Sequence, residues 1–104
     1  MDHKKLKKLI VKAEKLLKII QSIKYDDISN TRNRNIETIS RWIEYLKSVE
    51  TDEQFNEIWR EIQPASRYIL DWYAEPKQKM LLAHKIFEDF WNLALSIVIE
   101  ARNR

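Results

Sequence analysis

Hydrophobic residues recur at three- and four-residue steps along most of the chain, the spacing typical of helices with one buried face. The pattern divides into four runs separated by short polar joints. The first predicted helix runs from about Lys4 to Ile23. Its apolar positions are Leu6, Leu9, Ile10, Ala13, Leu16, Leu17 and Ile20. No stretch alternates polar and apolar residues for long enough to be a strand, so the sequence predicts an all-α fold.

A second helix is predicted from a cap at Ser29 or Asn30 to about Val49, and a last one from about Lys77 to Ala101. The second has the apolar stripe Ile36, Ile39, Ile43 and Leu46. The last has the face Met80, Ala83, Phe87, Phe90, Trp91, Ala94, Ile97 and Val98. Further apolar residues surround that face, which is typical of a central helix or of one with a second partner.

The third helix should begin at a capping box, because Thr51-Asp52-Glu53-Gln54 places Thr at the N-cap and Gln three residues later. Its apolar face is Phe55, Ile58, Trp59 and Ile62. Pro64 removes a backbone donor, yet Ile69 and Leu70 stay in phase with this face. We therefore predict one helix over 52–74, kinked near Pro64, in a four- to five-helix bundle.

Composition limits the classes of protein that fit this pattern. A chain of 104 residues with 44% hydrophobic residues suits a single folded domain, residues 1–104. The absence of cysteine excludes disulfides, a thiol nucleophile and Cys-ligated zinc, and the absence of glycine excludes glycine-rich phosphate loops. No apolar run approaches the ~18 residues of a membrane span. We expect a cytoplasmic protein that has no membrane partner.

Positive charge is concentrated in the first predicted helix. Residues 1–24 carry eight lysines against two acidic residues, a net charge of +6, whereas the rest of the chain has a net charge of −3. The lysines opposite the apolar face are Lys4, Lys5, Lys7, Lys8, Lys12, Lys15 and Lys18, and Val11 and Ile19 lie among them. Such a stripe is typical either of a solvent face or of contact with nucleic acid or an acidic partner. Membrane-surface binding is less well supported, because the core needs the apolar face.

Catalytic chemistry has little support in the sequence. His84 and Glu88 are one helical turn apart, but a closed zinc site needs four ligands. Glu57 and Glu61 are also one turn apart, without the Glu-x-x-His motif of carboxylate-bridged metals. Asp26-Asp27 fits turn chemistry. We predict no enzyme activity, no metal and no cofactor.

The segment Asn30 to Asn35 combines two arginines with three asparagines at the start of the second predicted helix. Free N–H groups and the helix dipole favour anions there, and guanidinium groups match phosphate oxygens. The alternative is that Arg34 pairs with Glu37 or Arg41 with Glu44 on the surface. That alternative leaves two cations in a first turn where the dipole opposes them. An anion partner is therefore favoured.

Four tryptophans offer flat rings for packing or for stacking on nucleic-acid bases. Trp59 and Trp91 lie on apolar stripes and are predicted to be in the core. Trp42 and Trp72 flank their stripes and are the better candidates for an interface.

Residues Ile28-Ser29-Asn30-Thr31-Arg32-Asn33-Arg34-Asn35-Ile36 resemble a motif of the small helical subunit of type III-A (Csm-type) CRISPR effector complexes. That family carries apolar–Thr–Thr–Ser–Lys–x–Arg–Asn–apolar at a helix start. Asn30 replaces a threonine, Asn33 stands where the family is usually apolar, and the usual glycine after the third helix is missing. "VKAEKLLKII", "ASRYILDWYAE" and "FEDFWNLALSIVIEARN" are similar to other segments of the family.

The resemblance implies a non-catalytic RNA-binding subunit whose copies stack head-to-tail along the guide RNA–target RNA duplex. The family contacts the duplex backbone without reading sequence and assembles with other subunits of the CRISPR effector complex. The candidate RNA-binding residues are Arg32, Arg34, Asn35, Arg41, Arg67, Lys8, Lys12 and Lys15. The alternative is a protein-binding helical bundle such as a bacteriocin immunity protein. A DNA-binding regulator fits less well, because a helix-turn-helix uses short helices and often a glycine turn.

Overall fold

A computed structural model describes residues 1–23, 30–70 and 77–104. These ranges contain four helices: α1 (His3–Ser22), α2 (Thr31–Ser48), α3 (Asp52–Ala65) and α4 (Lys77–Arg102). All regular structure in the described ranges is helical, which confirms the predicted all-α class. The predicted bounds of the first, second and last helices agree with the structure to within one or two residues.

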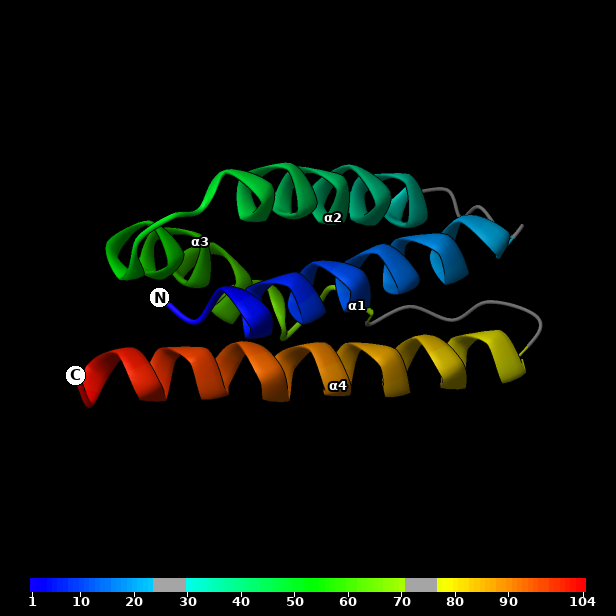
Figure 1. Ribbon diagram of the computed structural model, residues 1–104. Coiled ribbons are helices and arrows are strands. Elements are labelled where there is room, and N and C mark those ends of the chain that lie inside the picture. The colour runs from blue at the N-terminus through cyan, green and yellow to red at the C-terminus, as the bar shows by residue number, and fades with distance from the viewer. Residues whose placement is uncertain (24–29, 71–76) are drawn as a thin grey trace.

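The helices form an elongated bundle of 44 × 21 × 20 Å in which helices adjacent along the chain run antiparallel (Figure 1). The first helix lies between α2 and α4, and the shorter α3 packs against α2 and α4 near the end that holds both termini. At that end the Asp52 carboxylate forms two ion pairs, one with the N-terminal amine (N–O 3.6 Å) and one with the Arg104 guanidinium (N–O 3.2 Å). Both ends of the chain are thereby joined to the start of α3.

Two helix starts are capped by side chains. Asp2 accepts hydrogen bonds from the backbone N–H groups of Lys4 and Lys5, at 3.1 and 3.2 Å. The bond from Lys5 is the main reason that the pKa of Asp2 lies below its ordinary value. Thr51 and Gln54 form the predicted capping box. Asn30 occupies the N-cap position of α2 in the left-handed conformation (φ 61°), but its side chain accepts from the Asn33 amide instead of capping a backbone N–H.

The core is built from the predicted apolar stripes, which meet along the bundle axis. Every apolar residue predicted for α3 is buried, as are Leu6, Leu9, Ala13, Leu16 and Ile20 of α1. The rings of Trp42 and Phe90 stack across α2 and α4 with centroids 6.0 Å apart, and Trp59 lies 4.8 Å from Trp91. The predicted interface role of Trp42 is therefore wrong: this residue is fully buried, because α2 packs on more than one side. Trp72 lies outside the described residues.

The third helix ends earlier than predicted, and no kink at Pro64 is confirmed. It stops at Ala65, one residue after Pro64, and residues 66–70 continue as turns. Arg67 N–H bonds to the Pro64 carbonyl at 3.3 Å and Tyr68 N–H to the Ala65 carbonyl at 3.0 Å. Four-residue bonds occur beside them, from Ser66 N–H to the Ile62 carbonyl at 3.1 Å and from Ile69 N–H to the Ala65 carbonyl at 2.9 Å. The mixture of three- and four-residue bonds departs from the regular α-helical repeat. The apolar phase nevertheless persists, because Ile69 and Leu70 are buried. Residues 71–74 of the predicted helix lie outside the described residues.

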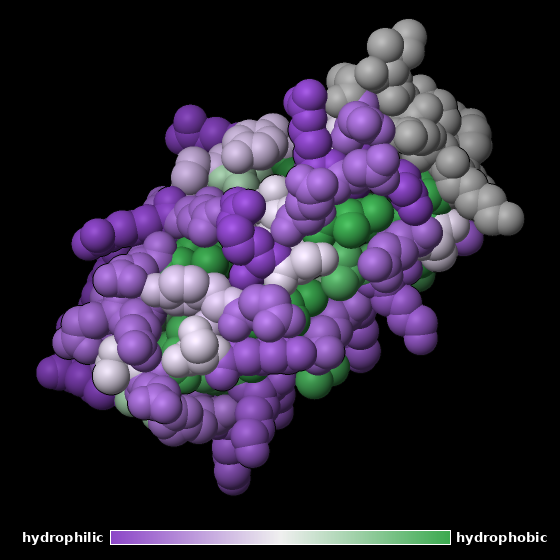
Figure 2. All heavy atoms as spheres, turned by 90° about the horizontal axis from the view of Figure 1, so that it is seen from above, coloured by the Kyte–Doolittle hydropathy of each residue, from purple (hydrophilic) through white to green (hydrophobic). Residues whose placement is uncertain are grey.

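Polar side chains cover most of the face seen in Figure 2, which looks down onto the α2 side of the bundle. Apolar side chains show only in patches between them. The larger exposed apolar side chains within the described ranges lie on α1, on α4 and in the turns after α3: Val11, Tyr68, Leu81, Leu82 and Ile99.

Candidate nucleic-acid interface

The eight predicted RNA-binding residues do not lie on one surface. Lys8, Lys12 and Lys15 lie on α1. Arg34 and Arg41 lie on the side of α2 that faces α3, since the Arg41 guanidinium donates to Glu61 of α3. Arg32 lies between α1 and α2, Asn35 lies in the core, and Arg67 follows the end of α3.

The outward side of α1 carries a continuous set of lysines. We define the lysine face as Lys4, Lys7, Lys8, Lys12, Lys15 and Lys18. All are exposed except the half-buried Lys12, because α1 turns its apolar stripe into the bundle. Within the described ranges, none of them forms an ion pair. Lys5 differs, because its ammonium pairs with Glu100 of α4.

Four of these lysines line a shallow hollow of about 340 Å³ together with the half-exposed Val11. The four are Lys7, Lys8, Lys12 and Lys15. Unpaired ammonium groups this close raise the local positive potential and attract counterions, which a polyanion releases when it binds. The hollow supplies charge but no planar donors, so it suits phosphate groups and not a particular base.

Arg32 has a structural role that the sequence did not reveal. Its side chain donates to the Ile23 carbonyl through Nε and to the Gln21 carbonyl at 2.9 Å through a terminal nitrogen. Both acceptors lie at the C-terminus of α1. Lys79 of α4 closes the same end by donating to the Ser22 carbonyl at 2.9 Å. Cations are favoured at a helix C-terminus, so the position of Arg32 in the first turn of α2 is explained by α1 without an external anion.

Asn35 is buried in the core, whereas the motif predicts that it contacts an anion. Its side chain is only 4% exposed, and its amide donates to the Ile69 carbonyl, which follows α3. The bond gives the buried Asn35 amide a protein partner, and a buried amide without one would be costly. Asn35 thus joins α2 to the turns after α3 and presents no donor to solvent on the surface of α2.

The three remaining arginines are exposed but separated. Arg41 is paired with Glu61, so much of its charge is compensated. Arg34 makes no side-chain hydrogen bond or ion pair to any described residue. Arg67 lines a hollow of about 410 Å³ with Gln63, Pro64, Ser66 and the half-buried Trp91. None of the three lines the hollow that Lys8, Lys12 and Lys15 share.

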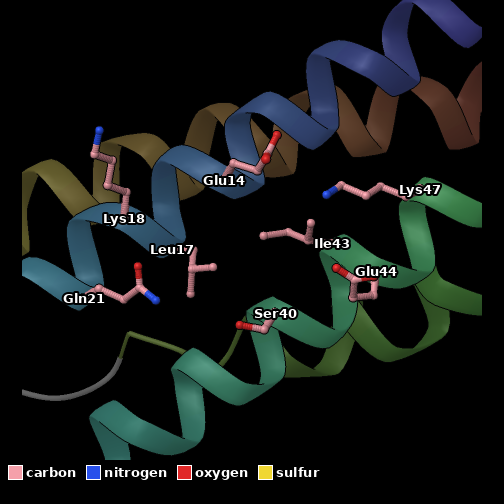
Figure 3. A pocket seen from close by; sticks show the side chains of 8 residues that line it. All are labelled: Glu14, Leu17, Lys18, Gln21, Ser40, Ile43, Glu44 and Lys47. Atoms are coloured by element: carbon pink, nitrogen blue, oxygen red, sulfur yellow. The ribbon is translucent and has the colours of Figure 1, made fainter.

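A second groove lies between α1 and α2, and sequence reasoning missed it. It encloses about 510 Å³, and Figure 3 shows Leu17 and Ile43 facing each other from the two helices. Two carboxylates (Glu14, Glu44), two lysines (Lys18, Lys47), Gln21 and Ser40 complete its lining. The balanced charges make this groove unsuited to a phosphate backbone. The sequence shows that Glu14 and Lys18 lie one helical turn apart on α1. It does not show that the packing of α1 on α2 places residues of α2 opposite them.

Carboxylates considered for catalysis have structural partners. Glu57 accepts a hydrogen bond of 2.6 Å from the Tyr45 hydroxyl, which raises the pKa of Tyr45 above its ordinary value. Glu61 pairs with Arg41. His84 and Glu88 are both exposed on α4. Within residues 1–23, 30–70 and 77–104, no group of three or more His, Cys, Asp or Glu side chains is positioned to hold a metal ion.

None of the described helices has the length and apolar character needed to cross a membrane. The chain matches no protein-family model, no curated protein and no solved structure. Function must therefore be argued from the surfaces described above.

Proposed function

We propose that this protein is a non-catalytic RNA-binding subunit whose lysine face contacts the phosphate backbone. The supporting observation is that the outward side of α1 carries six lysines without a single ion pair in the described part of the chain. Lys5 differs from these six, because its ammonium pairs with Glu100 of α4. Phosphate contacts position nucleic acid without reading sequence, which suits a face built from lysine alone.

A narrower form of the proposal is the small subunit of a type III-A CRISPR effector complex. It rests on the resemblance of residues 28–36, in which Arg34 is the exposed matching arginine. In this form the lysine face follows the guide RNA–target RNA duplex, copies stack head-to-tail, and other subunits cleave. Arg32 and Asn35 add less weight than the motif implies, because both already have protein partners.

The proposal is tested by RNA affinity measured against salt, with single-stranded and duplex RNA of unrelated sequences. The affinity should fall steeply as salt rises, because counterions are released from neutralised phosphates. Lys8→Glu and Lys15→Glu should each lower affinity for all sequences and reduce the salt slope by about 1. Arg60→Glu is the matched control, because Arg60 is an exposed cation on α3 and the change in net charge is the same.

Two results would contradict the proposal. Affinity that is independent of salt would exclude phosphate contacts as the source of binding. An equal loss in Arg60→Glu would show that net charge, and not the lysine face, determines the affinity.

A protein-binding helical bundle, such as a bacteriocin immunity protein, is the second candidate. The observation that favours it is the half-exposed apolar side chains of α1 and α4, Val11 and Leu82, which an RNA backbone would leave uncovered. A protein that remains monomeric, ignores RNA and co-purifies with a membrane receptor would favour this candidate over the first.

A further inference from the structure

An apolar groove runs between α1 and α4, which lie side by side and antiparallel (Figure 1). It encloses about 330 Å³ and is lined by Lys15, Lys18, Ile19, Ser22, Leu82 and Ile86. Among the described residues, the two lysines are its only charged lining residues. Leu82 is 49% exposed although it lies on the α1 side of α4.

The groove adjoins the hollow around Val11, because Lys15 lines both. The hollow at Val11 and the groove at Ile19, Leu82 and Ile86 are therefore neighbours, and lysines line both. We call this pair the lysine-flanked trough. Val11 and Ile19 are eight residues apart on one helix, which places them about 12 Å apart along its axis.

That spacing is slightly more than two turns of a helix, the distance between apolar residues at positions i and i+8 of a second helix. A helix that crosses α1 obliquely can therefore place one apolar side chain in each hollow. The charged groups that the described residues place on its rim are ammonium groups, so the flanks of that helix must carry carboxylates. We propose that the lysine-flanked trough binds an acidic amphipathic helix of a partner protein, by the helix-in-groove mode.

The other polyanions fit this trough less well. An RNA backbone pairs with the lysines but gains nothing from covering Leu82 and Val11. An anionic membrane surface requires apolar side chains that protrude and usually aromatic anchors, whereas here the apolar points lie in hollows whose described lining residues include no aromatic side chain. Charge and shape together select an occupant that is both acidic and apolar. This inference does not depend on RNA binding.

The probe is a panel of fluorescein-labelled helical peptides with leucines at i, i+4 and i+8 and glutamates beside them. Binding to the full chain is measured by fluorescence anisotropy. Leu82→Ser should weaken binding about five- to tenfold, because the peptide no longer buries the exposed half of a leucine side chain. Leu81→Ser is the matched control: Leu81 is the adjacent leucine, is 59% exposed and lies outside the trough. It should leave the affinity unchanged.

Several outcomes separate the proposal from its alternatives. Peptides with serine for leucine, or with glutamine for glutamate, should bind at least about tenfold more weakly, since each loses one of the two complementary features. Failure of the whole panel to bind, or equal effects of Leu82→Ser and Leu81→Ser, would overturn the proposal. So would phosphatidylglycerol vesicles that bind with the same dependence on Leu82. Unchanged RNA affinity in Leu82→Ser keeps this test distinct from that of the RNA proposal.

Discussion

Arg32 joins the first turn of α2 to the C-terminus of α1, where its guanidinium donates to the carbonyls of Gln21 and Ile23. A cation in the first turn of α2 is opposed by the dipole of that helix, whereas a cation at the C-terminus of α1 is favoured. The dipoles of α1 and α2 thus have opposite effects on the Arg32 charge. The hydrogen bonds from its guanidinium to the two carbonyls favour the observed arrangement. Its conformation is thus explained without RNA.

Replacement of Arg32 should therefore affect stability. We expect Arg32→Ala to lower the free energy of unfolding by about 1–3 kcal/mol, because two carbonyls lose charge-assisted hydrogen bonds. Arg34→Ala is the control: Arg34 is exposed and has no partner among the described residues, so its loss should change stability by less than about 0.5 kcal/mol. Urea denaturation followed by circular dichroism measures both. Equal losses would show that the contacts of Arg32 contribute nothing.

At the residue scale, the sequence predicts the burial of apolar side chains better than it predicts the contacts of polar side chains. Phe55, Ile58 and Ile62 follow a period that a reader can count, and all are buried. Asn35 is buried because of the Ile69 carbonyl, 34 positions away, which no local pattern reveals. Trp42 stood at the edge of its stripe, and its burial depends on Phe90 of α4. Contacts distant in sequence thus decided which candidate site residues remained on the surface.

At the scale of the element, α1 carries the lysine face and depends on other parts of the chain for its ends. Asp2 caps its N-terminus, while Arg32 of α2 and Lys79 of α4 donate to its last carbonyls. The helix has no basic residue in its own last turn. The two neighbours that pack along its sides also complete its C-terminus, so the position of the lysine face is fixed by α2 and α4.

The start of α1 should loosen in acid. The pKa of Asp2 is below its ordinary value, mainly because its carboxylate accepts the Lys5 backbone bond. Since the folded pKa is the lower one, the contribution of the cap is present above the unfolded value of about 3.8 and is lost as pH falls through the folded pKa. The amide resonances of Lys4 and Lys5 should therefore shift below pH ~4. In Asp2→Asn the cap does not titrate, and the same shift there would contradict this assignment.

The bounds of the elements could be predicted where caps and periodicity agree, and not where they conflict. Thr51 and Gln54 mark the start of α3 in the sequence and in the structure. At its end, the apolar phase of Ile69 and Leu70 suggested that the helix continues past Pro64. Turns with three-residue hydrogen bonds bury the same residues, so hydrophobic phase alone does not distinguish a kinked helix from a helix followed by turns.

At the scale of the whole molecule, the bundle has a hydrophobic core and a charged surface. The first helix lies between α2 and α4, so its apolar stripe is covered from two sides and its lysines are left outside. Trp42 and Phe90 stack on the inner side of that arrangement and join α2 to α4. The surface that we propose for RNA and the trough that we propose for a partner helix both depend on this arrangement of α1.

Phe90 should therefore be a residue on which the entire bundle depends. It is fully buried, it stacks on Trp42 and its ring centroid lies 6.0 Å from that of Phe87. We expect Phe90→Ala to cost about 3–5 kcal/mol, because it removes buried apolar area and leaves a cavity between α2 and α4. Domains of this size have only about 5–15 kcal/mol of stability, so thermal unfolding should shift strongly.

The control for this prediction lies on the same helix. Ile99 is 48% exposed, and Ile99→Ala should cost less than about 1 kcal/mol, because solvent already covers half of the side chain and alanine favours the helix. Calorimetric unfolding of both variants compares the losses directly, and RNA affinity measured well below the melting temperature separates stability from binding. If Phe90→Ala unfolded no earlier than Ile99→Ala, the contact between α2 and α4 would not hold the bundle together. The position of the lysine face would then require another explanation.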